Sequence, residues 1–111
     1  MNKIFISIFI LLSFVGVCFA QFRPPVNGNV VLGTSPSRLP NFEVYNCTLQ
    51  APSGNTGAVY VGGSIVTNGG GGNPGIALGA GSSISNISVN NANWLYVVAD
   101  NANDRVIYLC N

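Results

Sequence analysis

Charge is the first thing that this sequence lacks. Only seven of its 111 residues are charged, or 6%, against about 25% in an ordinary soluble domain. Four are Lys or Arg, three are Asp or Glu, and there is no histidine. So small a basic count excludes a nucleic-acid clamp, which must neutralise many phosphates. The absence of histidine removes the side chain used most often for proton transfer near neutral pH.

Two sequence patterns are also missing. Beyond residue 20, no segment places apolar residues at helical spacing, which argues against helices. The three cysteines never form a Cys-x-x-Cys pair, which leaves zinc binding and thiol redox catalysis without support. We therefore expect an all-β protein that binds no metal and no cofactor and catalyses no reaction.

The first 20 residues are typical of a cleaved signal peptide. Lys3 supplies a positive charge, residues 4–17 form an apolar core, and Ala20 ends the segment with a small residue. One alternative is a retained membrane anchor, for which the apolar run is short. The other is acylation of Cys18, which Val17 before it disfavours. Cleavage after Ala20 leaves about 91 residues, enough for one domain.

The two remaining cysteines, Cys47 and Cys110, are expected to form a disulfide, because an exported chain meets an oxidising environment. The alternative is two unrelated buried thiols. In the chain-entropy picture, a bridge closing so long a loop is worth about 4 kcal/mol. The expected location is secreted, periplasmic or at a cell surface, with no stable membrane span once the signal peptide is removed.

Strand signals alternate with turn residues along the rest of the chain. Residues 21–38 hold three prolines around a short apolar run, so we expect an extended arm with one edge strand. Further strands are expected at residues 42–49, 58–61, 64–67, 76–78, 82–89, 93–99 and 105–110. Segments 58–61 and 64–67 should form a hairpin. In segment 82–89, Ile84 is out of phase with Ile87, which predicts a bulge near residues 85–86.

The strand pattern predicts the fold class. Seven or eight short strands, with turn signals every eight to twelve residues, are typical of a small antiparallel β-sandwich of the jelly-roll or immunoglobulin-like kind, or of a small barrel. We expect the sandwich to occupy residues 39–111.

Three patterns resemble functional motifs, and each has a plainer explanation. Gly70, Gly72 and Gly75 fit G-x-G-x-x-G, but no helix follows them to face a phosphate, so a flexible loop is favoured. Asp100 and Asp104 bracket a turn faintly like a calcium loop, but its glycine and distal glutamate are missing. Glu43 with either aspartate could be drawn as a glycosidase pair, but no motif sets their separation.

The aromatic residues and two sequons are the remaining candidates. The tryptophan and four tyrosines could stack on sugars, although on apolar strands they are more often core or interface residues. They are Tyr45, Tyr60, Trp94, Tyr96 and Tyr108. Residues 46–48 and 86–88 read Asn-x-Thr and Asn-x-Ser, which are glycosylation acceptors only in a eukaryotic host.

Three blocks, at residues 51–63, 75–82 and 95–100, resemble small phage and prophage virion-associated proteins of the head-decoration or tail-accessory kind. They read APSGNTGAVYVGG, GIALGAGS and LYVVAD, and the resemblance extends over residues 39–109. It implies a non-enzymatic β-sandwich that packs on a larger assembly and has no catalytic residues. The signal peptide and the cysteine pair depart from that pattern and favour a secreted, cell-surface or domesticated relative.

Two functions remain open at this point. The first is an exported structural or interaction module, whose partner is another protein or a second copy. The second is a secreted carbohydrate-binding module that uses exposed aromatic and Asn side chains. Segments 93–99 and 105–110 are apolar on both faces, which favours assembly through an uncovered face. The candidate interface residues are Trp94, Leu95, Tyr96, Val97, Ile107 and Leu109.

Overall fold

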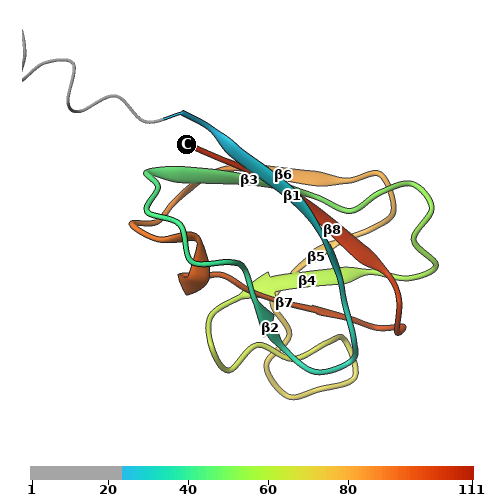
Figure 1. The fold of residues 1–111 in the computed structure, drawn as a ribbon. Coiled ribbons are helices and arrows are strands. Elements are labelled where there is room, and N and C mark those ends of the chain that lie inside the picture. The colour runs from blue at the N-terminus through green and yellow to red at the C-terminus, as the bar shows by residue number, and fades with distance from the viewer. Residues whose placement is uncertain (1–23) are drawn as a thin grey trace, which may run out of the picture.

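The computed structural model describes residues 24–111, which form two four-stranded antiparallel sheets packed as a sandwich (Figure 1). The first sheet has the order β1-β8-β3-β6 and the second β2-β7-β4-β5. The elements are β1 Val26–Val31, β2 Ser37–Arg38, β3 Asn46–Gln50, β4 Val59–Gly62, β5 Ile76–Leu78, β6 Ser83–Ser88, the 3-10 helix η1 Ala92–Trp94, β7 Tyr96–Ala99 and β8 Arg105–Cys110. The predicted small antiparallel β-sandwich is confirmed. The signal peptide expected over residues 1–20 lies outside the described residues.

Strict alternation of side chains builds the core. Along β8, every second residue is buried, as expected of a strand with one face on the core. The inner faces of β3 and β8 contribute Cys47, Leu49, Val106, Tyr108 and Cys110, and those of β4 and β7 contribute Val59, Val61, Val97 and Ala99. Each fully buried Val or Leu is worth about 1.5–3 kcal/mol relative to an exposed one, so these strands hold the two sheets together.

The segment expected to be an extended arm belongs to the sandwich. Strand β1 pairs with β8 over six residues, and β2 pairs with β7. Both lie at sheet edges, where the proline-rich flanks cost no ladder hydrogen bonds. The predicted boundary between arm and sandwich after Arg38 is therefore wrong for the described residues. The arm supplies two edge strands, one to each sheet, whereas a single edge strand was predicted.

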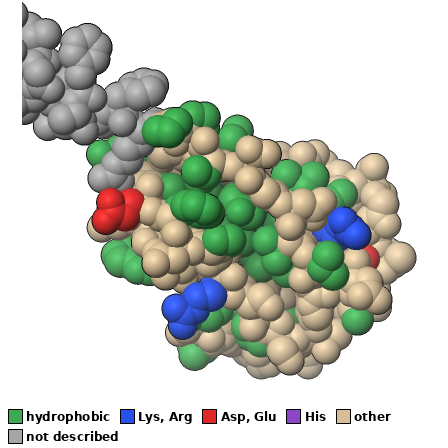
Figure 2. Space-filling view, in the orientation of Figure 1, with side chains coloured by type: hydrophobic (Ala, Val, Ile, Leu, Met, Phe, Trp, Pro, Cys, Tyr) green, Lys and Arg blue, Asp and Glu red, His purple; other side chains and the backbone are tan. Residues whose placement is uncertain are grey.

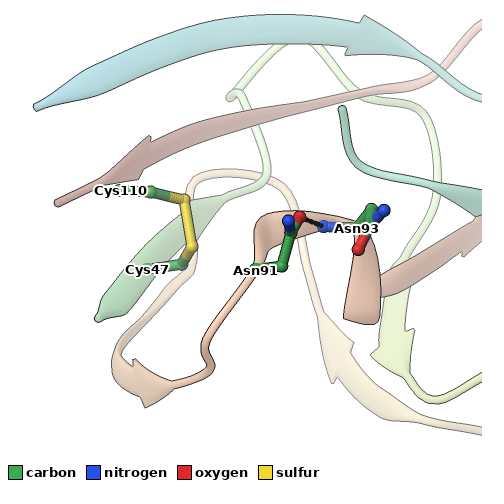
Figure 3. Close-up of a disulfide and its surroundings, with 4 residues drawn as sticks. All are labelled: Cys47, Asn91, Asn93 and Cys110. Atoms are coloured by element: carbon green, nitrogen blue, oxygen red, sulfur yellow. Dashed lines mark hydrogen bonds between the residues drawn. A yellow bond between two sulfur atoms is a disulfide. The ribbon is translucent and has the colours of Figure 1, made fainter. Parts of the chain in front are cut away.

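Two strands, β3 and β7, begin three or four residues later than predicted. The chain bends at Tyr45 before β3, so Tyr45 is 59% exposed and does not share the inward face of Cys47. Segment 93–99 begins with the 3-10 helix rather than a strand. There, the Asn91 side chain accepts a hydrogen bond from the Asn93 backbone N–H at 3.0 Å (Figure 3). A side chain that bonds to the backbone two residues ahead favours a turn over strand pairing at this position.

The predicted hairpin between segments 58–61 and 64–67 is wrong. Strand β4 pairs with β5 and β7 instead, and the chain turns after Gly63, where the Val66 N–H bonds to the Gly63 carbonyl at 3.0 Å. The buried Val66 packs over Gly62 and Gly75. A Cβ at Gly75 would overlap the carbonyl oxygen of Val61, so glycine is needed where β5 begins.

The predicted bulge is confirmed. Cys47 pairs with Ile87, but Leu49 pairs with Ile84, so β6 carries one extra residue between these pairs. Asn86 takes the left-handed conformation there, with φ 59°. Asn tolerates this conformation better than most residues, and the extra residue returns Ile84 to the core side of the sheet.

The predicted disulfide between Cys47 and Cys110 is confirmed (Figure 3). The two residues are cross-strand partners on β3 and β8, with Cα atoms 4.0 Å apart. The adjacent pair, Asn46 and Asn111, exchanges both backbone hydrogen bonds, so the cysteines occupy the closer, non-hydrogen-bonded site of the ladder. The bridge therefore fastens the last strand to the centre of the first sheet.

Candidate functional site

The outer face of the first sheet carries an aliphatic strip with polar borders. Ile107 and Leu109 of β8 are 37% and 53% exposed. Leu109 lies between Asn27 of β1 and Thr48 of β3, and Gln50 lies beside Ile107. These five residues line a shallow groove of about 340 Å³, and we call them the first-sheet face.

The surface as a whole carries little charge. In the orientation of Figure 1, hydrophobic side chains collect across the middle of the molecule, and the few charged ones lie toward its margins (Figure 2). A surface of this kind offers little electrostatic repulsion against association.

The six candidate interface residues divide between surface and core. Trp94, Ile107 and Leu109 are exposed and Tyr96 is half-buried. Leu95 is 7% exposed and Val97 is fully buried, and both belong to the core between the sheets. Their assignment to an interface is therefore wrong, because these side chains already contact their own chain.

A glycine-rich loop, residues 63–74, covers the other side of β7, which the sequence analysis expected to lack a cover. The Asn68 side chain donates to the Ala99 carbonyl at 3.3 Å, and the Gly69 N–H donates to Asp100 at 3.1 Å. Val98 is consequently fully buried on the face opposite Val97. The glycines of this loop are the feature of the sequence that indicates packing against the sheet, because a residue without a Cβ allows two backbones to come this close.

This loop also forms one wall of a second groove, which is larger than the one on the first sheet. The groove has a volume of about 550 Å³ and lies between the loop and residues 34–36. Hydroxyl and amide side chains line it together with three apolar ones: Thr34, Ser35, Ser64, Thr67 and Asn68, with Pro36, Ile65 and Val66. None of its lining residues is ionisable. We call it the second-sheet groove. It could not be predicted from the sequence, because its walls come from segments far apart along the chain.

The two aspartates of the turn that faintly resembles a calcium loop are held by hydrogen bonds within the fold. Asp104 accepts from the backbone N–H groups of Thr56 and Gly57, each at 2.9 Å, and from the Thr56 hydroxyl at 3.1 Å. Asp100 accepts from the Tyr60 hydroxyl at 3.1 Å. Burial and this hydrogen bond raise the pKa of Tyr60. Both aspartates thus tie the β7–β8 turn to neighbouring segments.

The hydrogen bond from the Thr56 backbone N–H, reinforced by Gly57, lowers the pKa of Asp104 below its ordinary value. A lowered pKa in the folded state stabilises the protein above the unfolded-state pKa, and this contribution is lost as pH falls through the folded-state pKa. We expect Asp104→Asn to lower the Tm at neutral pH. The difference from the unmodified protein should shrink in acid, below the pKa of Asp104. Thermal unfolding at both pH values checks this, and an equal Tm at neutral pH would contradict it.

The structure keeps apart the carboxylates that could be drawn as a glycosidase pair. The backbone of Glu43 forms an isolated β-bridge with Asn91, before β7 begins, whereas Asp100 and Asp104 follow the end of β7. Within residues 24–111, no three His, Cys, Asp or Glu side chains gather where they could hold a metal ion. Over the same residues, no helix is long and apolar enough to cross a membrane.

No protein-family model, curated protein or solved structure matches this chain. The resemblance to phage and prophage virion-associated proteins therefore stays a prediction.

Proposed function

We propose that the protein is an exported, non-enzymatic structural module that associates with a second copy of itself through the first-sheet face. The observation that carries this proposal is the exposure of Ile107 and Leu109 on the central strand β8. Apolar side chains grouped on an exposed sheet face are typical of interaction surfaces.

The polar border of the first-sheet face favours a second copy as the partner. The amides of Asn27 and Gln50 and the hydroxyl of Thr48 each donate and accept hydrogen bonds. In a two-fold dimer, the same patch meets itself, so such groups can satisfy one another across the interface. The few charges of the chain, four basic and three acidic, add little repulsion between copies.

Two observations support export and a non-enzymatic role. The Cys47–Cys110 disulfide suits an oxidising compartment outside the cytosol. Neither groove presents a carboxylate, an amine or a thiol for proton transfer or nucleophilic attack, and Tyr108 is the one ionisable residue that lines either of them.

The test places a charge on the first-sheet face. We expect the secreted protein to have the mass of a dimer by light scattering at micromolar concentration, and Leu109→Asp to have the mass of one chain, because two carboxylates would face the interface. Ile76→Asp is the matched control, because Ile76 is an aliphatic residue of the second sheet whose exposure, 59%, is close to the 53% of Leu109. This variant should keep the mass of the unmodified protein. A monomeric unmodified protein would refute the proposal.

A further inference from the structure

The second-sheet groove and the ring of Tyr96 lie on the same side of the second sheet. Val66 lines the groove and packs over Gly62, where a Cβ would stand 2.9 Å from Val66 Cγ2. Gly62 is the register partner of Tyr96 across β4 and β7. On the other side, Arg38 of β2 is the register partner of Tyr96. The guanidinium carbon of Arg38 lies 5.5 Å from the centroid of the Tyr96 ring. The groove therefore lies on the same face of the second sheet as Tyr96 and Arg38.

Trp94 extends this surface by one more side chain. Leu95 has an extended backbone, with φ −92° and ψ 127°, and its side chain is buried. The Leu39 N–H bonds to the Leu95 carbonyl at 3.0 Å, so Trp94 lies beside the end of β2, the strand that carries Arg38. The Trp94 side chain is 59% exposed. The backbone N–H of Trp94 donates to the Asn91 carbonyl at 3.2 Å, which holds the turn in place.

The chemistry of this surface matches one class of ligand. A pyranose ring has a flat face of C–H groups, which an exposed indole can stack against, and a rim of hydroxyls, which need donors and acceptors. The groove supplies those groups from Thr34, Ser35 and Ser64, and Arg38 adds further donors. No ionisable side chain lines the groove itself, and the Arg38 guanidinium on the same face lies over the Tyr96 ring, so the groove favours an uncharged sugar.

We propose that the outer face of the second sheet binds a neutral oligosaccharide, in a track from the second-sheet groove past Arg38 and Tyr96 to Trp94. The track lies on the opposite sheet from the first-sheet face, so binding and self-association are independent and can be tested separately. A protein with both surfaces could assemble on a glycan-covered surface and hold it at several points.

Native gel electrophoresis through immobilised soluble polysaccharide tests the track. The probes are hydroxyethyl cellulose, xylan, galactomannan, a β-1,3-glucan and glycogen, with polygalacturonate as an anionic probe. We expect at least one neutral polymer to retard the protein, and Trp94→Ala to raise its dissociation constant about tenfold. Trp94→Phe keeps an aromatic face and should retain most of the binding.

Two control variants separate the track from other causes. Tyr45→Ala removes an aromatic residue that is also 59% exposed but lies at the start of the first sheet, and it should bind normally. Leu109→Asp disrupts the first-sheet face and should also be retarded normally. Failure of all neutral polymers to retard the protein would overturn the proposal. Retardation by polygalacturonate alone, or retardation that survives Trp94→Ala, would overturn it as well.

Discussion

Reduction of the Cys47–Cys110 disulfide is expected to lower the free energy of unfolding by about 4 kcal/mol. The bridge spans a sequence separation of 63 residues, and a cross-link over so long a loop removes much conformational freedom from the unfolded chain. Small domains are stable by only about 5–15 kcal/mol in total. The reduced protein should therefore be at least partly unfolded near physiological temperature.

Urea denaturation of the oxidised and reduced proteins measures this difference. The double variant Cys47→Ala with Cys110→Ala is the control, because it removes the cross-link without leaving thiols that can re-oxidise. Agreement between the reduced protein and the double variant would assign the loss to the cross-link. Equal stability of the oxidised and reduced forms would contradict a stabilising role for the bridge.

Val97→Asp is expected to prevent folding, at a cost of at least about 4 kcal/mol. Val97 is fully buried in the core between the sheets, and a carboxylate there would have neither water nor a counter-charge. Ile107→Asp makes the same change on β8, at a side chain that is 37% exposed, and should leave the fold intact. Circular dichroism and thermal unfolding distinguish the two variants. A cooperative transition of Val97→Asp near that of the unmodified protein would show that Val97 is not in the core.

Features that depend on neighbouring residues could be predicted from the sequence. The bulge in β6 followed from the phase of Ile84 against Ile87, because a strand with one buried face must keep a period of two. The disulfide followed from two cysteines in a chain with the marks of export. The all-β class followed from short strand-like runs separated by turn residues.

Features that depend on distant segments could not be predicted. The choice of β5 rather than residues 64–67 as the partner of β4 depends on Val66 packing over Gly62 and Gly75. The start of segment 93–99 becomes a 3-10 helix, where the Asn91 side chain bonds to the backbone two residues ahead. Local strand propensity cannot anticipate either outcome, because tertiary contacts outweigh it.

The same division applies to the candidate surfaces. The sequence shows that β7 and β8 are apolar on both faces and that the chain carries almost no charge to keep copies apart. It does not show that residues 63–74 cover Val98 while Ile107 and Leu109 stay open, which depends on the fold. The physical reason is that alternation along a strand shows which side chains share a face. Whether that face meets solvent or another part of the chain depends on contacts between segments far apart in sequence.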